Sequence, residues 1–308
     1  MLKKEERYTP QYLKDNFWNG TVDNDIKVKC LEVKKGEQLS LVDNNEICEK
    51  SIKYCLYRAL KDFTDRTETK KDGVESYGPI KKLEDLYKEG FVGEFVGYFY
   101  QEKSQTDFDQ WHNGMCENFL NVVKNYYKSD IQYGKAQKIV NMTFKNIYCL
   151  QNADKYEEYF KYCHMPLDSI MLEWFYRAGY ISELKIRDKK VSRNYPSWSN
   201  LKYENDSDGK YSYIEIQKWI REYFDLSDKT DIKTQWTPFT AEFVLWKRMQ
   251  FEFAAEGLYS QLLALDSLSG DKKSKEKNDF EISSVGDKKR SLEEKLKNTR
   301  FDFINTEI

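Results

Sequence analysis

Apolar residues recur at helical spacing along most of this chain, and this periodicity limits the fold classes that it can adopt. The clearest run lies between Asn44 and Phe63, where the apolar positions share one stripe: Ile47, Ile52, Cys55, Leu56, Ala59, Leu60 and Phe63. The same periodicity predicts helices over 80–100, 107–128, 214–224 and 241–265, the first of them interrupted by glycines at 90, 93 and 97. We therefore expect a mainly α, multi-helical protein.

The N-terminal part has a different pattern. Apolar and polar residues alternate over 25–33, which predicts a strand, and the turn-like Lys35-Gly36-Glu37 follows it. The last part is rich in Lys, Asp, Ser and Glu, a composition typical of a solvated segment. We expect three parts: an N-terminal extension with a small β element (1–43), a helical core (44–266) and a polar, flexible tail (267–308).

Composition excludes several classes of protein. Lys and Arg number 50 against 52 for Asp and Glu, so the chain lacks the basic excess of many nucleic-acid binders, although a local basic face is not excluded. No P-loop, dinucleotide-binding, nucleophile-elbow or kinase motif is present. The charged start and the absence of a 20-residue apolar run predict a cytoplasmic protein without a membrane partner. With two histidines and no Cys-x-x-Cys pair, we expect no metal and no cofactor.

The segment from Asp130 to Lys145 has the layout of a tight turn at Gly134 that leads into a helix. The first backbone N–H groups of a helix have no partner within it, and together with the helix dipole they can bind a phosphate. Lys135 and Lys138 would add positive charge to such a site. The alternative is an ordinary helix start preceded by a glycine.

A second segment, from Cys163 to Tyr180, predicts an extended approach followed by a helix. Pro166 disfavours helix at the residue before it, and Asp168 occupies the position of a helix N-cap. Asp168 is therefore either a capping residue or a carboxylate with a chemical role. His164 is a further candidate for the same site, with a hydrogen-bonded structural histidine as the alternative. We interpret tryptophans such as Trp198 as packing residues.

Together these two segments, about residues 130–180, resemble the helix-hairpin-helix family of base-excision DNA glycosylases. Gly134 to Lys145 is similar to the second helix of the family's DNA-binding hairpin, although one of the usual two glycines is missing. Leu167-Asp168 is similar to the motif that contains the catalytic aspartate, and Arg177 and Gly179 match the helix that follows. Where members that also nick DNA have a lysine, this chain has Ala136.

The resemblance implies a multi-helical, helix-hairpin-helix glycosylase-like core that binds duplex DNA with one base flipped out. It implies a monofunctional enzyme that hydrolyses the N-glycosidic bond of a damaged or modified base, with modified phage DNA as one candidate substrate. Asp168 would be catalytic, Gly134, Lys135 and Lys138 would bind DNA, and His164 and Arg177 would be further site members. The alternative is a non-enzymatic helical module that binds DNA or a protein.

Overall fold

The structure is a computed structural model that describes residues 10–61, 63, 78–127, 131–181, 197–204, 212–227, 237–250, 253 and 290–291. The chain divides into two compact units, Met1–Phe243 and Val244–Ile308. Almost everything described belongs to the first unit, and the following account concerns that unit. The predicted three-part division of the chain stays a prediction.

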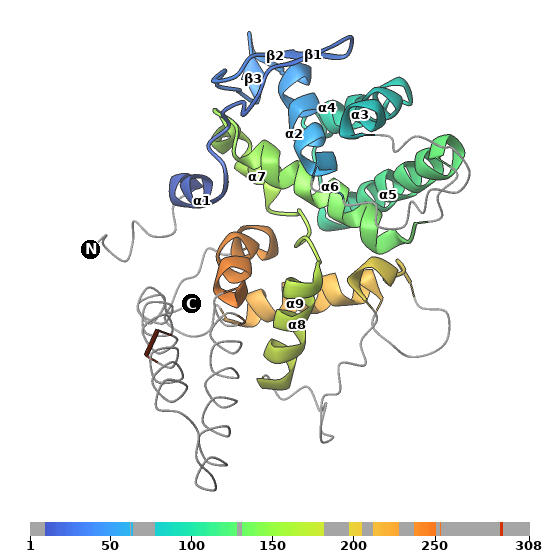
Figure 1. The fold of residues 1–308 in the computed structure, drawn as a ribbon. Helices are drawn as coiled ribbons and strands as arrows, with labels where there is room; N and C mark the ends of the chain where they lie inside the picture. The colour runs from blue at the N-terminus through green and yellow to red at the C-terminus, as the bar shows by residue number, and fades with distance from the viewer. Residues whose placement is uncertain are drawn as a thin grey trace, which may run out of the picture. The chain divides into compact units, whose positions relative to one another are not determined.

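The first unit is mainly helical, as the periodicity predicts (Figure 1). Its α-helices are α1 Pro10–Phe17, α2 Glu49–Lys61, α3 Pro79–Lys88, α4 Phe91–Tyr98, α5 Gln105–Tyr127, α6 Tyr133–Tyr148, α7 Glu157–Phe160, α8 Ser169–Ile181 and α9 Tyr213–Ser227. Two 3₁₀ helices are η2 Ala153–Tyr156 and η3 Trp198–Asn200. A further helix covers 238–250 and crosses into the second unit. Among the described residues, no helix is long and apolar enough to cross a membrane.

Helix α6 lies at the centre of this unit, in contact with α2, α5 and η3. It is buried on almost every side, although its sequence contains many polar residues. Those polar side chains have partners, as buried polar groups require. Asn146 donates to the carbonyl of Cys55 in α2, and the Thr143 hydroxyl donates to the Ile139 carbonyl within α6. The partners of the other buried polar residues of α6 form the candidate site.

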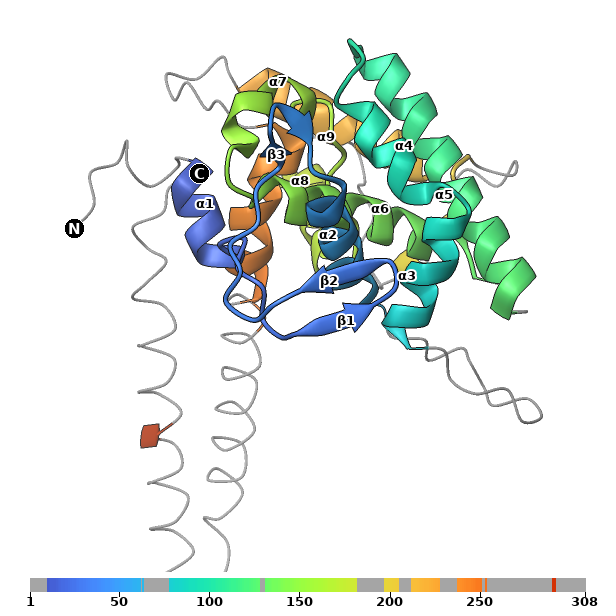
Figure 2. The same cartoon turned by 90° about the horizontal axis from the view of Figure 1, so that it is seen from above.

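The N-terminal β element is confirmed, but in a different form from the single strand over 25–33. β1 (Ile26–Val28) and β2 (Leu31–Val33) pair antiparallel, because the chain turns at residues 29 and 30. β3 (Val42–Asp43) and β4 (Glu46–Ile47) form a second two-stranded sheet. The β1–β2 hairpin lies beside α2, as the view from above shows (Figure 2).

The predicted helix over 44–63 begins too early. Asn44 and Asn45 have φ of 50° and 68° and form the turn between β3 and β4, so α2 starts only at Glu49. Asparagine tolerates this left-handed conformation better than most residues, and two in succession match the tight hairpin turn found here. Of the breaks predicted at glycines 90, 93 and 97, only the first is confirmed: Gly90 has a φ of 76° and separates α3 from α4, whereas Gly93 and Gly97 lie within α4. Of the helix predicted over 241–265, residues 241–250 and 253 are described as helical.

Candidate functional site

Asp168 lies at the head of α8, where it caps the helix. Its Oδ1 accepts hydrogen bonds from the backbone N–H groups of Ile170 (2.9 Å) and Met171 (3.0 Å). Its Oδ2 faces Lys138 of α6, whose Nζ lies 3.4 Å away. The Asp168 side chain is 15% exposed and that of Lys138 27%, so solvent reaches this ion pair. The carboxylate is thus fixed through one oxygen, and its second oxygen points toward the helix of the predicted hairpin.

The extended segment that leads to Asp168 is fixed by two buried glutamines. Gln137 of α6 accepts from the N–H of Leu167 (3.2 Å) and donates to its carbonyl (2.6 Å). Gln217 of α9 binds both backbone groups of Met165 in the same way, at 3.1 and 2.8 Å. These amide side chains replace the hydrogen bonds that a neighbouring strand would supply. They therefore determine where Asp168 enters α8.

Gly134 lies in the first turn of α6 rather than in a turn before it. Its backbone N–H donates to the carbonyl of Leu201 (3.0 Å), so this donor is already occupied. A Cβ at Gly134 would lie 1.8 Å from the carbonyl oxygen of Trp198. The segment with η3 therefore packs directly on the start of α6, and only glycine allows this approach. The contact of Gly134 with DNA stays a prediction.

Lys135 belongs to a local concentration of positive charge near the start of α6. Its Nζ lies 5.7 Å from the centroid of the Phe63 ring, and the Nζ of Lys82 in α3 lies 5.2 Å from the same centroid. Burial, together with the smaller effect of the nearby Lys135 charge, lowers the pKa of Lys82 to about 8. The near-neutral net charge of the whole chain does not reveal this concentration.

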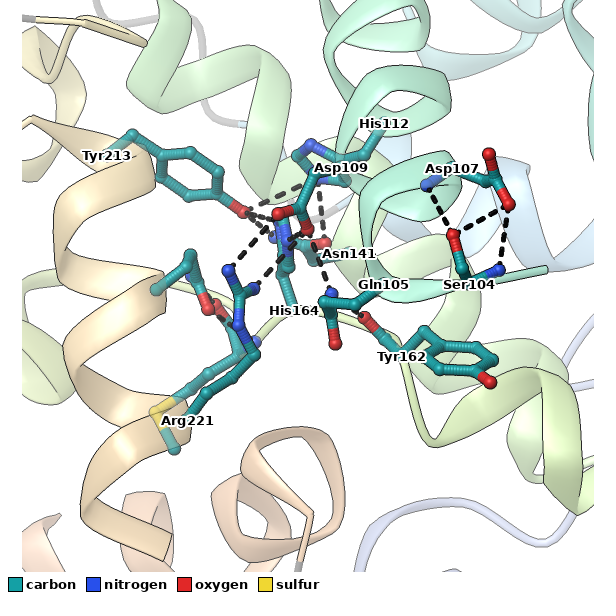
Figure 3. A network of polar contacts seen from close by, with 12 residues as sticks. Ser104, Gln105, Asp107, Asp109, His112, Asn141, Tyr162, His164, Tyr213 and Arg221 are labelled. Atoms are coloured by element: carbon teal, nitrogen blue, oxygen red, sulfur yellow. Dashed lines mark hydrogen bonds and ion pairs between the residues drawn. The ribbon is translucent and has the colours of Figure 1, made fainter. Parts of the chain in front are cut away.

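His164 belongs to a buried polar network between α5, α6 and α9 (Figure 3). Its Nε2 lies 2.7 Å from Oδ1 of Asp109, and its Nδ1 lies 3.0 Å from the hydroxyl of Tyr213. That hydroxyl also accepts from Asn141 Nδ2 (2.9 Å), and Asn141 Oδ1 lies 2.9 Å from Nε2 of His112. Both imidazoles are buried.

The chemistry of these partners assigns a direction to each hydrogen bond. The carboxylate of Asp109 accepts, so Nε2 of His164 carries the proton and its Nδ1 accepts from Tyr213. The amide oxygen of Asn141 also accepts, so Nε2 of His112 carries its proton, and Nδ1 accepts from the Tyr133 hydroxyl 3.3 Å away. Every donor then meets an acceptor with both histidines neutral. A second proton on either ring would face a hydroxyl that already donates to it.

Electrostatics at the two ends of the network differ. Burial lowers the pKa of His164, and it lowers the pKa of His112 well below its usual range, with the neighbouring His164 adding to the effect. Burial alone would raise the pKa of Asp109, but the hydrogen bond from His164 and the charge of Arg221 leave it lowered. Arg221 of α9 contacts both oxygens of Asp109, at 3.1 and 3.3 Å. The network therefore presents an ion pair near solvent and neutral groups inside.

These shifts predict a loss of stability in weak acid. Below pH 6.5, the ordinary pKa of histidine, the unfolded chain binds protons that the folded chain excludes. The free energy of unfolding therefore decreases as the pH decreases. Each histidine contributes up to about 1.4 kcal/mol per pH unit. Urea unfolding between pH 7.5 and 5.5 measures the sum, to which Glu242 contributes with opposite sign because burial raises its pKa.

The histidines can be separated from all other groups by proton NMR, because the chain contains only two. The ring resonances of His112 and His164 should stay those of neutral imidazole through pH 6.5 in the folded protein, with Nε2 protonated. Titration of either ring near pH 6.5 in the folded state would contradict the assigned network.

A second ion pair lies near Asp168 but is fully buried. Lys145 of α6 contacts Glu242, and their side chains are 5% and 3% exposed. Burial raises the pKa of Glu242, an effect that Lys145 opposes and Asp168 increases. The rings of Phe17 and Phe243 cover the Lys145 ammonium at 4.2 and 4.6 Å from their centroids. Asp168 thus has a second carboxylate in its electrostatic surroundings.

Of the predicted site residues, Asp168 and Lys138 are in contact, and Gly134 begins the same helix as Lys138. His164 is fixed in the buried network, on the far side of Pro166 from Asp168. Arg177 lies within α8, but its side chain is outside the described part. Sequence reasoning missed the partners Asp109, Asn141, Tyr213 and Arg221 and the two glutamines. The spacing of Gln137 and Asn141, one helical turn apart, places them on one face of α6 but does not distinguish a buried polar face from a solvated one.

The described residues contain no group of three His, Cys, Asp or Glu side chains arranged to hold a metal ion. No family model matches this chain, and neither a curated protein nor a solved structure shows significant similarity to it.

Proposed function

We propose that this protein is a monofunctional DNA glycosylase with a helix-hairpin-helix-like core, in which Asp168 is the catalytic carboxylate. One observation carries the proposal: Lys138, on the helix that resembles the DNA-binding hairpin, contacts Oδ2 of Asp168 at 3.4 Å. The two halves of the sequence resemblance, separate along the chain, therefore meet in one partly exposed place. The modified base that is released belongs to a flipped-out nucleotide, and modified phage DNA remains a candidate source.

The chemistry requires a negative charge beside the sugar. As the bond between C1′ and the base nitrogen breaks, its electron pair leaves with the base, and positive charge develops on the sugar. Two backbone N–H groups hold Asp168 Oδ1, and Oδ2, which faces Lys138, would stabilise that charge and accept a proton from the attacking water. The products are a free base, which takes up a proton, and an abasic sugar.

Positive charge near the start of α6 supports contact with the DNA backbone. Lys135 and Lys138 are partly exposed here, and lysine side chains contact phosphates without reading sequence. Lys82 is buried and adds only its charge. The Gly134 amide is bonded to Leu201 in this conformation, so the lysine side chains, rather than that amide, are the groups that we expect to meet phosphate.

Asp168→Asn tests the assignment. Asparagine is also a good N-cap and can keep the two hydrogen bonds to α8, so the fold should be retained while the charge is lost. We expect base release to fall by about 10²- to 10³-fold, with DNA affinity little changed. The measurement is alkali-dependent strand breakage in duplexes with ordinary, damaged and phage-type modified bases.

A matched control is Asp107→Asn, which alters another carboxylate at a helix start, in the first turn of α5, where it accepts hydrogen bonds from Ser104 just before the helix and lies outside the Asp168 site. It should leave base release unchanged. If no duplex is cleaved by wild type, and Asp168→Asn affects only stability, the alternative holds: a non-enzymatic module that binds DNA or a protein. The capping bonds of Asp168 favour this alternative, since helix capping alone is enough to account for an aspartate at this position.

A further inference from the structure

Lys82 lies in the first turn of α3 and is buried, which is uncommon for a lysine. It is 6% exposed, whereas the side chain of Lys88 at the other end of the helix is 64% exposed. Its Nζ lies 5.2 Å from the centroid of the Phe63 ring and 5.7 Å from that of the Tyr127 ring. The Tyr127 hydroxyl donates to Asp85 (2.9 Å), and this hydrogen bond holds the second ring in place. The amine of Lys82 therefore lies beside two aromatic rings and largely out of contact with water.

Two features of this place disfavour a positive charge, in addition to burial itself. The Nζ of Lys135 lies 5.7 Å from the same Phe63 centroid, so two lysine side chains bring their charges to one ring. Lys82 is also the fourth residue of α3, at the positive end of the helix dipole. The rings act in the opposite direction, since an aromatic face attracts a cation. Burial and Lys135 outweigh the rings, and the pKa of Lys82 is lowered to about 8.

A lysine in these surroundings is a nucleophile near neutral pH. At pH 7.5 its neutral share is about 10²-fold larger than that of a lysine with the ordinary pKa of about 10.4. Because the amine is buried, a small and uncharged electrophile can reach it more easily than a large or charged one. Carbon dioxide has both properties, and it adds to neutral amines to form carbamates. A carbamate is an anion, so it suits the neighbourhood of Lys135 and the start of a helix better than an ammonium does.

We propose that Lys82 binds carbon dioxide covalently as a carbamate. The lone pair of Nζ forms a bond to the carbon atom, one C=O electron pair moves onto oxygen, and a proton leaves the nitrogen for water. The products are –NH–COO⁻ on Lys82 and one H⁺, with no change of oxidation state. The negative carbamate then attracts the Lys135 ammonium, which the positive ammonium of Lys82 had repelled. The reaction is reversible, because loss of carbon dioxide restores the amine.

The modification reverses the charge of one residue near the start of α6. Lys82 changes from positive to negative, and Lys135 then faces an anion. The positive charge available to a phosphate there decreases, so carbon dioxide should weaken binding of DNA. This consequence rests on the proposed function, whereas the carbamate itself does not. A carbamate on a protein that binds no DNA would retain the site at Lys82 and reject the proposed DNA contact.

The test is ¹³C NMR of the protein in ¹³C-labelled bicarbonate at pH 7.5. We expect a carbamate resonance that Lys82→Met removes, because methionine fills the apolar site without an amine. Lys88→Met, which changes the exposed lysine of the same helix, should leave this resonance unchanged. Lys135→Gln should weaken it by about 5-fold, because one nearby positive charge is lost.

Thermal unfolding shows whether the variants are folded, and Lys82→Arg, which keeps the positive charge, replaces Lys82→Met if methionine is not tolerated. A guanidinium is not deprotonated in proteins, so it forms no carbamate. Spectra in which every carbamate resonance survives the substitution of Lys82 overturn the proposal. A Lys82 resonance that Lys135→Gln leaves unchanged overturns it as well, because the neighbouring charge would then have no part in the site.

Discussion

A Lys145→Met variant is expected to lose about 3–5 kcal/mol of its free energy of unfolding near pH 8. Lys145 is the ion-pair partner of Glu242, and both side chains are almost fully excluded from solvent. Without the ammonium, the carboxylate of Glu242 would be buried without a compensating charge, because the Phe17 and Phe243 rings that contact the ammonium are uncharged. Urea unfolding followed by circular dichroism measures the loss.

Two further variants make this prediction specific. Lys145→Met combined with Glu242→Leu should recover most of the stability, since it removes both charges and leaves apolar groups among the phenylalanines. Lys138→Met, which breaks the more exposed pair with Asp168, should cost less than about 1 kcal/mol. The loss in Lys145→Met should also shrink as the pH falls, because burial raises the pKa of Glu242 and a protonated Glu242 carries no charge. A loss that stays constant with pH would refute the buried ion pair.

Periodicity was sufficient to predict the longer helices, because a stripe of apolar residues has to face a core in whichever way the helices pack, but it did not predict the short helices α1 and α7. It could not reveal that α6 is central. Lys145, Gln137 and Asn141 look like the solvated face of a surface helix, and each is buried because a residue distant in sequence supplies its partner. Such pairings depend on packing, which a single sequence does not specify.

For the candidate site too, local features could be predicted from the sequence and contacts between distant residues could not. The N-cap at Asp168 follows from local sequence, since a proline-led approach, an aspartate and an apolar run suffice to indicate it. The contact between Asp168 and Lys138 could be expected only through the family resemblance. The role of Gly134 could not be predicted from the sequence. A glycine before a lysine suggests a helix start open to solvent, whereas here the missing side chain allows the carbonyl of Trp198 to pack against Gly134.

Gly134→Ala should have the second large effect, and its sign opposes helix propensity. Alanine favours helix over glycine by about 1 kcal/mol, so a helix with room for the methyl group would be stabilised. Here the new Cβ would meet the Trp198 carbonyl oxygen at 1.8 Å and its carbon at 2.9 Å, both backbone atoms. The segment with η3 must move away, and the bond from Gly134 N to Leu201 is lost. We expect a net loss of about 1–3 kcal/mol in thermal or urea unfolding.

Gly114→Ala is the matched control, because Gly114 lies within α5 and a Cβ there meets nothing within 4 Å. It should stabilise the protein by about 0.5–1 kcal/mol, so the two substitutions should differ in sign. If Gly134→Ala also stabilises, the segment with η3 does not rest on α6 in solution. The Trp198 indole would then have no fixed place beside the Lys138 ammonium. Gly134 therefore links the stability of this unit to the geometry of its candidate site.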